Sequence, residues 1–524
     1  MTQPEDEVAL AEALGRLLAG RHGLGPRVRI DSLRRLSGGA SRETWSFVAR
    51  ADDDPIGADG AGRGADGNRS TGEGRPLILQ RVRPGLSMGG PSLRTEDRLL
   101  AAAARAGVPV PTVVVDAVAA RPVLGEARVT AHVDGETLGP RIVRGEGHGH
   151  AREVLAGQCA RALAAIHALD PAPFAGHGTA GAALDTVASD DTIGPDGTGG
   201  GDDTAGLTQV DTLGRIREGL DLLDEARPAF ELALRWLHDN HPDPGPVTVV
   251  HGDFRMGNLI VDDQGLAAVL DWELAHLGDP REDLGWLCVR AWRFGGDGEV
   301  GGFAPLEDLL DAYAEATGAA VDAEAVRWWI VAGTLTWGLI CAVQAHRHLD
   351  GHVRSVELAT IGRRVCETEY DLLDLLHVTA PLAPVAAGAD SSRSVAAAAS
   401  SLHGRPTAAE LVDAVRSHLV EQVAPSLDGS AAFALKVASN ALAIVQRELE
   451  LGPQMETAAA AGLAALDVGL ADEASLAAGI RAGTVDGGRP DVAATVRRLV
   501  ADRLRVANPK WLRPADRTDL DDMA

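Results

Sequence analysis

The residues with the clearest chemical potential lie in one segment of the sequence, 249–286. An apolar run ends at His251, and the polar loop that follows carries Asp253 and Asn258. A predicted hairpin of two short strands then leads to Asp271. Because these side chains stand at strand ends and in the loop beside them, we expect two carboxylates and one amide to meet on one side of a cleft.

Phosphoryl transfer requires this combination of groups. One carboxylate orients the attacking hydroxyl and accepts its proton, while further oxygen atoms hold magnesium against the phosphates. The order of the residues therefore predicts Asp253 as the catalytic base and Asn258 and Asp271 as magnesium ligands. A lone His-Gly-Asp or a lone Asp is more often a turn or a cap, but the ordered combination favours catalysis.

The segment resembles the aminoglycoside phosphotransferase and choline kinase family, whose catalytic loop reads H-G-D-x-x-x-x-N and whose metal aspartate begins D-W or D-F. The pattern is matched without a gap by His251, Gly252, Asp253, Asn258, Asp271 and Trp272. The resemblance spans residues 30–375 and implies a two-lobed kinase-like fold that uses ATP and Mg²⁺ to phosphorylate the hydroxyl of a small molecule. It also implies that Asp279 and Asp283 brace the catalytic loop, with His251 in a structural role.

Within this family the chain looks most similar to the branch that occurs fused to acyl-CoA dehydrogenases. That branch phosphorylates hydroxyacyl-CoA compounds. The resemblance therefore implies a hydroxyacyl-CoA or similar metabolite as one possible acceptor, although a sugar, an amino alcohol and an antibiotic stay open.

Nucleotide-binding residues are expected in a small N-terminal lobe. The stretch LSGGASRETW predicts a glycine-containing turn between strands, which could lay backbone N–H groups and the Ser41 hydroxyl over phosphates. The resemblance further implies that Glu96, early in the helix after those strands, pairs with a phosphate-binding base.

That base is the main departure from the family. The only lysines are Lys436 and Lys510, and the family register places Gln80 where lysine or arginine is expected. Adjacent strand residues face opposite sides, so either Gln80 binds without charge or Arg81 reaches the cleft through a bulge or shifted register. Arg83 is a further candidate if the strand ends early. We expect removal of Arg81 to weaken ATP binding more than removal of Gln80.

The absent lysine also supports a rival interpretation. A pseudokinase would keep the fold for binding a nucleotide or a partner and would transfer nothing. The intact set of Asp253, Asn258 and Asp271 argues against this alternative.

The elements that must position these residues predict an α+β protein. Strands near 45–48 and 77–79 form a hairpin, followed by a helix near 93–106 and strands at 112–116 and 128–132. The expected organisation is an N-lobe at 1–133 with an insertion at 51–74, a mainly helical C-lobe at 134–385 with an insertion at 176–206, a linker at 386–404, and an all-α C-terminal domain at 405–524.

The C-terminal domain carries no recognisable chemistry. Thr407 and Glu410 have capping-box spacing, and an apolar stripe then follows one helix face at Leu411, Val415, Leu419 and Val423. These patterns predict a small helical bundle, which could serve oligomerisation of the chain or docking of a partner.

The whole chain excludes several classes of function. A net charge of −26 over 524 residues opposes nucleic-acid binding. The four cysteines lack the spacing of a metal or redox motif, and the apolar run 328–343, which includes three tryptophans, is too short to span a membrane and predicts a buried helix. The acidic, amphipathic start of the sequence favours the cytoplasm.

Overall fold

The computed structural model describes residues 4–21, 24–36, 42–51, 74–82, 90–176, 206–223, 225–380, 382, 406–466, 470 and 472–517. The chain forms two compact units: unit 1 comprises 1–210 and 244–326, and unit 2 comprises 211–243 and 327–524. The expected linker at 386–404, and the interiors of both expected insertions, lie outside the described residues.

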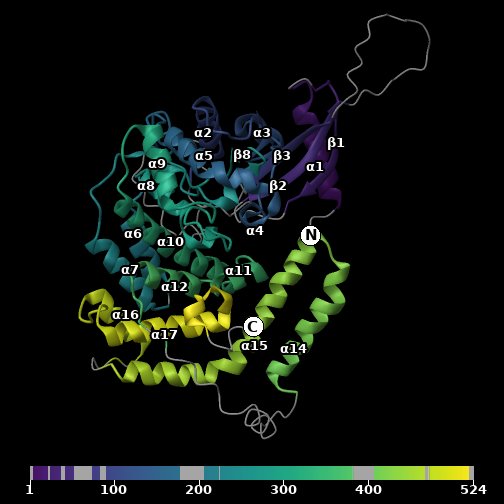
Figure 1. Ribbon diagram of the computed structural model, residues 1–524. Helices are drawn as coiled ribbons and strands as arrows, with labels where there is room; N and C mark the ends of the chain where they lie inside the picture. The colour runs from purple at the N-terminus through teal and green to yellow at the C-terminus, as the bar shows by residue number, and fades with distance from the viewer. Residues whose placement is uncertain are drawn as a thin grey trace, which may run out of the picture. The chain divides into compact units, whose positions relative to one another are not determined.

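An antiparallel five-stranded sheet forms the N-terminal lobe of unit 1 (Figure 1). Its strands, in the order β1-β2-β3-β5-β4, are β1 (Val28–Arg35), β2 (Arg42–Ala51), β3 (Arg75–Val82), β4 (Val113–Val115) and β5 (Ala127–Ala131). The predicted hairpin is confirmed, because Trp45 pairs with Leu79 and Phe47 with Leu77 between β2 and β3.

One face of this sheet is apolar and the other is polar. Trp45, Phe47, Leu77, Leu79 and Val129 lie on the apolar face, where α1 (Pro4–Leu18) and α3 (Ala117–Leu124) cover them. Strand alternation therefore directs the residues between them to the opposite face.

Unit 1 contains helices beside and after the sheet. They are α2 (Leu93–Arg105), α4 (Gly139–Arg144), α5 (Gly149–His167), α8 (Arg281–Leu287) and α9 (Leu306–Thr317). Helix α2 begins as predicted, with the Ser92 side chain accepting the Thr95 N–H. Helix α3 was not predicted, because Pro122 lies inside it; the Asp116 carboxylate caps it by accepting the Ala119 N–H.

Two short antiparallel pairs carry the segment with the chemical residues. β7 (Leu259–Asp262) pairs with β8 (Gly265–Val269), which confirms the predicted hairpin. β6 (Thr248–Val250) pairs with β9 (His276–Gly278). Strand β9 was not predicted, since three residues are too few to show a period.

Unit 2 is helical. Its helices are α6 (Thr212–Leu222), α7 (Pro228–Asp239), most of α10 (Ala323–Leu349), α11 (Val356–Gly362), α12 (Val365–Leu375), α14 (Ala408–His418), α15 (Gly429–Ala464), α16 (Glu473–Ala482) and α17 (Pro490–Ala507). Single turns occur in both units at Glu146–His148, Met256–Asn258, Arg290–Trp292, Leu419–Val423, Ala424–Ser426, Pro509–Trp511 and Pro514–Asp516.

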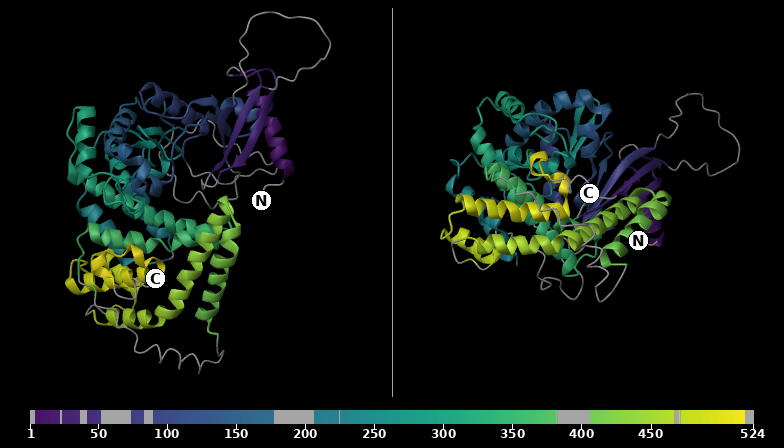
Figure 2. Two further views of the ribbon diagram at one scale, coloured as in Figure 1. Left: turned by 45° about the vertical axis from the view of Figure 1, so that its right-hand side comes forward. Right: turned by 60° about the horizontal axis from the view of Figure 1, so that its bottom comes forward.

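Helices α14 and α15 lie side by side, and α15 bends along its length (Figure 2). Pro453 lies within α15 and accounts for a bend, because proline removes a helical hydrogen bond and clashes with the preceding turn. The predicted capping box of Thr407 and Glu410 is confirmed. The apolar stripe from which a helical bundle was predicted is covered only in part, because Leu411 and Val415 are 53% and 51% exposed.

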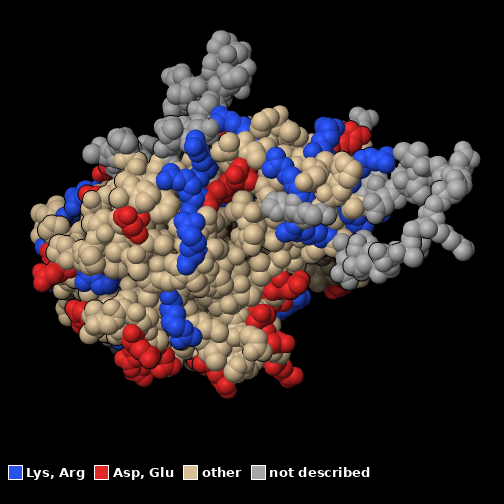
Figure 3. Space-filling view, turned by 90° about the horizontal axis from the view of Figure 1, so that it is seen from above, with Lys and Arg blue, Asp and Glu red and all other residues tan. Residues whose placement is uncertain are grey.

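Helix α10 is long and apolar enough to cross a membrane by length and composition alone, yet 61% of its most apolar 18-residue window is buried. Trp328, Leu335 and Leu339 belong to a core that α10 forms with α6, α7 and α12. The predicted buried helix is therefore confirmed. The face drawn in Figure 3 carries both signs of charge, with many acidic side chains along its lower edge and basic side chains across its middle and top.

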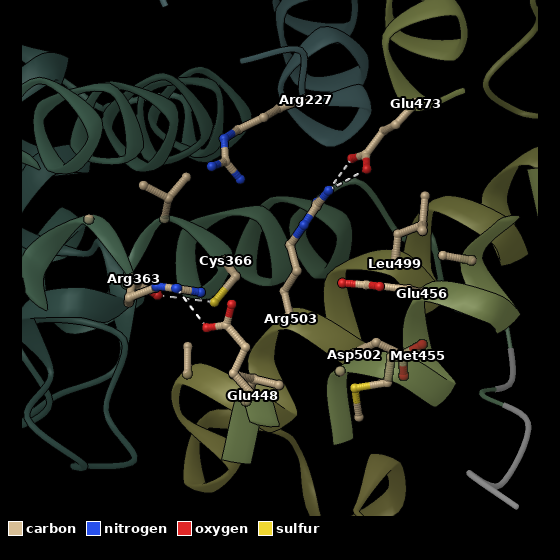
Figure 4. Close-up of a pocket in the computed structure, with 16 residues that line it drawn as sticks. Arg227, Arg363, Cys366, Glu448, Met455, Glu456, Glu473, Leu499, Asp502 and Arg503 are labelled. Atoms are coloured by element: carbon tan, nitrogen blue, oxygen red, sulfur yellow. Dashed lines mark hydrogen bonds and ion pairs between the residues drawn. The ribbon is translucent and has the colours of Figure 1, made fainter. Parts of the chain in front are cut away.

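A second core of unit 2 joins α12 to the C-terminal helices. Cys366, Tyr370 and Leu373 of α12 pack with apolar residues of α15, α16 and α17. Buried polar contacts strengthen this core: the Glu369 carboxylate, which is fully buried, pairs with Arg503 of α17 at 3.4 Å and with Arg227 at 3.1 Å. Both arginines also line a cavity of about 330 Å³, where Arg503 reaches Glu473 (Figure 4).

This shared core predicts that the chain 1–385 will not be stable without residues 406–524. Truncation would expose Cys366, Tyr370 and Leu373, and each large apolar side chain contributes about 1.5–3 kcal/mol when buried. We expect the truncated chain to aggregate or to unfold at a clearly lower temperature than the full chain. Co-expression of 406–524 as a separate fragment should restore its solubility. A soluble 1–385 with an unchanged unfolding temperature would contradict this expectation.

Candidate active site

The backbone of the His-Gly-Asp turn is fixed by two features. Gly252 has φ +76°, and a Cβ atom there would lie 2.3 Å from the Leu274 carbonyl oxygen, so only glycine fits. The Asp283 carboxylate accepts the backbone N–H groups of His251 at 2.8 Å and of Gly252 at 2.9 Å. The Asp283 carboxylate and the glycine conformation therefore fix the turn that precedes Asp253.

His251 links this turn to the hairpin. Its Nδ1 accepts the Asp253 N–H at 3.2 Å, and its Nε2–H donates to the Leu270 carbonyl at 3.1 Å. Burial of the ring lowers the pKa of His251, against the raising effect of nearby carboxylates. A neutral ring with its proton on Nε2 satisfies both bonds, which supports the predicted structural role.

Asp283 is itself held by a buried chain of side chains. Its Oδ2 accepts from His167 Nε2 at 3.1 Å, and His167 Nδ1 accepts from the Tyr313 hydroxyl at 2.8 Å. Burial would raise the pKa of Asp283, but the hydrogen bonds that it accepts from His167 and from the His251 N–H lower it below its usual value. The carboxylate thus stays ionised and can accept the loop N–H groups.

The carboxylate of Asp253 is oriented by three donors. Its Oδ1 accepts from Arg255 Nε at 2.8 Å and from Trp286 Nε1 at 2.9 Å, and its Oδ2 accepts from Asn258 Nδ2 at 2.6 Å. Each carboxylate oxygen can accept about two hydrogen bonds. Oδ2 therefore retains one acceptor position, while both positions of Oδ1 are used.

Arg255 and Trp286 were not predicted as part of the site. The guanidinium of Arg255 stacks 4.6 Å from the ring centre of Trp292, whose ring lies 5.5 Å from that of Trp286. The position of Arg255, two residues after Asp253 in the same loop, was the only sequence signal for its contact with the carboxylate. Trp286 comes from α8, and its contact with Asp253 depends on tertiary packing that local spacing does not reveal.

Asn258 and Asp271 are placed by the hairpin. Asn258 uses its amide nitrogen for the Asp253 carboxylate and for the Asp253 carbonyl at 2.9 Å, which leaves its amide oxygen as a ligand atom. The Leu270 N–H donates to the Asn258 carbonyl at 2.8 Å, directly before Asp271. Asp271 has φ +64°, a strained conformation for a residue other than glycine and one that is enriched at functional sites.

Burial and neighbouring carboxylates raise the pKa of Asp271. Burial, with the neighbouring Glu273 and Asp253 carboxylates, raises the pKa of Asp271 to about 7, although the Arg42 charge opposes the shift. A carboxylate and an amide oxygen beside a surplus of negative charge form a donor set that suits a hard divalent cation.

The raised pKa of Asp271 predicts a pH dependence of stability in the absence of divalent cations. The folded protein holds this proton up to about pH 7, whereas the unfolded chain releases it near pH 4. The free energy of unfolding should therefore fall as pH rises from about 4 to about 7, with one pKa unit corresponding to about 1.4 kcal/mol. Thermal unfolding of the unmodified chain and of Asp271→Asn at pH 5 and pH 8 tests this; an equal pH response would contradict it.

The polar face of the N-lobe sheet carries an ion-pair cluster around Glu96. Arg42 of β2 donates to both oxygens of this fully buried carboxylate, once at 2.8 Å, and Arg128 of β5 donates at 2.9 Å. Burial would raise the pKa of Glu96, but the two guanidinium groups lower it. Glu96 was predicted to pair with a base, and the structure places two arginines beside it.

Gln80 and Arg81 lie on opposite faces of β3. Gln80 faces the cluster, where its Oε1 accepts from Arg128 Nε at 2.9 Å. Arg81 donates to Glu43 at 2.7 Å on the other face. The register of β3 with both neighbouring strands is regular, so no bulge turns Arg81 toward Glu96. This geometry does not support the expectation that loss of Arg81 weakens ATP binding more than loss of Gln80.

Other predicted features lie elsewhere. Ser41 and Arg83, with the glycine turn 37–40, lie outside the described residues. Trp328 and Trp329 of α10, in unit 2, are 2% and 8% exposed and form part of its core.

Two parts of the chain are similar to known protein families. The model of the phosphotransferase enzyme family matches residues 32–329, and a domain of unknown function, DUF6285, matches residues 425–511. Acyl-CoA dehydrogenase family member 10 of Mus musculus is 45% identical over 64 residues, which are 12% of this chain and only 6% of that protein.

Two solved structures are similar at low identity. One is a Ralstonia eutropha protein assigned as an aminoglycoside phosphotransferase, with 19% identity over 70% of this chain and 98% of its own, and a TM-score of 0.47. The other is a choline/ethanolamine kinase family protein of Mesorhizobium loti, with 20% identity over 71% and 95% of the two chains and a TM-score of 0.40. The family match at residues 32–329 covers more than half of the 524 residues, and it shows that this chain belongs to the phosphotransferase enzyme family.

Proposed function

We propose that the protein transfers the γ-phosphoryl group of ATP to the hydroxyl of a small molecule. The observation that carries this proposal is the arrangement at Asp253, a carboxylate fixed by three donors with one acceptor position left on Oδ2. Asn258 and Asp271 follow on the same hairpin. This set provides a proton acceptor and oxygen ligands, which phosphoryl transfer requires.

Asp253 acts as the base in this proposal. The acceptor hydroxyl donates to Oδ2, and its proton passes there as the hydroxyl oxygen bonds to phosphorus. The bond between that phosphorus and the bridging oxygen breaks, and ADP leaves with the electron pair. Arg255 and Trp286 hold Oδ1 throughout, so the carboxylate does not reorient during the step.

Asp271 and the amide oxygen of Asn258 would hold Mg²⁺. The ion supplies positive charge against the phosphate oxygens, as in other phosphotransferases. Among the described residues no group of three or more His, Cys, Asp or Glu forms a metal site of its own. A site with few protein ligands suits Mg²⁺, which commonly keeps waters and binds together with substrate phosphates.

A screen of hydroxylated metabolites for ATP consumption tests the proposed function. A hydroxyacyl-CoA is the first acceptor to include, because the mouse relative carries the name of an acyl-CoA dehydrogenase family member. Sugars, amino alcohols and aminoglycosides complete the panel, and the product is confirmed by mass as one added phosphate. Binding of Mg–ATP without turnover on any acceptor would favour the pseudokinase alternative, which the neutral Gln80 in place of lysine supports.

A further inference from the structure

The Glu96 cluster contains two arginines that could supply the positive charge that β3 lacks at Gln80. Arg42 lies on β2, one strand away from the position where kinases carry their lysine. Arg42 pairs with Val82 of β3, and Thr44, two residues along β2, pairs with Gln80, so Arg42 and Gln80 lie on the same face of the sheet in neighbouring positions. The side chain of Arg42 is 9% exposed and lies on the polar face with Gln80 and Arg128.

Arg42 also reaches the segment of the metal ligands. Its Nε lies 3.2 Å from the carboxylate of Glu273, two residues after Asp271. Arg42 therefore stands between helix α2, through Glu96, and the loop that carries Asp271, which is the place where phosphates would meet a metal held by that loop.

The two arginines differ in what they can still bind. A guanidinium has five N–H groups. Arg42 directs three of its nitrogens to Glu96 and Glu273, which leaves two N–H groups without a partner among the described residues. Arg128 is more enclosed, at 3% exposure, and spans Gln80, Glu96 and Asp97. This geometry suits Arg42 for binding a ligand and Arg128 for holding Glu96 and Gln80 in position.

We propose that Arg42, supplied by β2, is the phosphate-binding cation of this protein, and that Gln80 serves to hold Arg128 in place. This inference rests on the proposed use of ATP. In this assignment β2 supplies, through Arg42, the positive charge that kinases place on β3, and β3 itself supplies no charged side chain to the phosphates.

Calorimetric titration of three ligands, Mg–ATP, Mg–ADP and adenosine, into variants of the full chain tests this assignment. Loss of a charge-assisted contact should weaken Mg–ATP and Mg–ADP binding to Arg42→Met by about 10- to 100-fold, with adenosine affinity unchanged. Arg81→Met, on the opposite face of the sheet, is the matched control and should bind all three normally. In the Arg42→Met background, Gln80→Lys should restore most of the lost affinity.

Removing one partner of a buried ion pair can prevent folding. Arg42→Met/Glu96→Gln is therefore compared with Glu96→Gln alone, with unfolding temperatures measured for each variant. Relative to Glu96→Gln alone, the double variant should lose the same factor of about 10- to 100-fold in Mg–ATP affinity that Arg42→Met loses relative to the unmodified chain. If Arg42→Met binds Mg–ATP normally, or if adenosine weakens in parallel with ATP, Arg42 only braces the helix and the inference is overturned. If the unmodified chain binds no Mg–ATP, the proposed function itself fails before any variant is compared.

Discussion

Asp253→Asn is expected to reduce phosphoryl transfer by about 10²- to 10⁴-fold, the usual contribution of a general base. Mg–ATP binding should stay within about threefold of normal, because the proposed mechanism assigns this carboxylate to the acceptor hydroxyl and not to the metal. The fold should persist, since Arg255 and Trp286 can still donate to the remaining amide oxygen. Turnover with an acceptor from the screen, measured beside calorimetry, separates the two effects.

One complication of this variant lies at Asn258. The new amide group would face the Asn258 Nδ2, a donor, in place of the Oδ2 that now accepts from it. Asp253→Ala is therefore measured in parallel, and Asp263→Asn, an exposed position in the turn of the same hairpin, serves as the matched control. Near-normal turnover of both Asp253 variants would show that the base lies elsewhere.

Asp271→Asn should have the complementary effect. An amide is a weaker ligand than a carboxylate for a hard cation, so Mg–ATP affinity should fall by about tenfold or more, and turnover should fall with it. Adding Mg²⁺ well above the normal requirement should recover part of the activity of Asp271→Asn. It should recover none in Asp253→Asn.

Titration of Mg–ATP at increasing Mg²⁺ provides the measurement. The unmodified chain and Asp263→Asn define the normal dependence. If Asp271→Asn required no more Mg²⁺ than these controls, Asp271 would not be a metal ligand. The strained backbone at φ +64° would then need another explanation.

Local spacing predicted those parts of the site that lie close together in the sequence. Asp253, Asn258 and Asp271 belong to one loop and one hairpin, whose short strands and turn are visible as a pattern. The cluster at Glu96 was only half predictable. Its arginines belong to β2 and β5, and their meeting depends on strand pairing over long separations, whereas attention to β3 alone suggested Gln80 or Arg81.

Helix existence was easier to predict than helix burial. The capping box at Thr407 correctly indicated the start of α14. The apolar stripe after it predicted packing, yet Leu411 and Val415 are more than half exposed. Periodicity shows which residues share one face of a helix, but it does not show what covers that face.

The arginine cluster has a consequence for covalent chemistry. Lysine amines in nucleotide sites react with acyl phosphates and activated esters, and they also acquire acyl groups from thioesters. Guanidinium groups stay protonated at neutral pH and are poor nucleophiles. Because residues 1–435 contain no lysine, ATP-derived reagents that label kinases through that amine have no target in the region that contains Arg42 and Arg128. Acyl-CoA thioesters would likewise find no lysine amine to acylate beside Arg42 and Arg128.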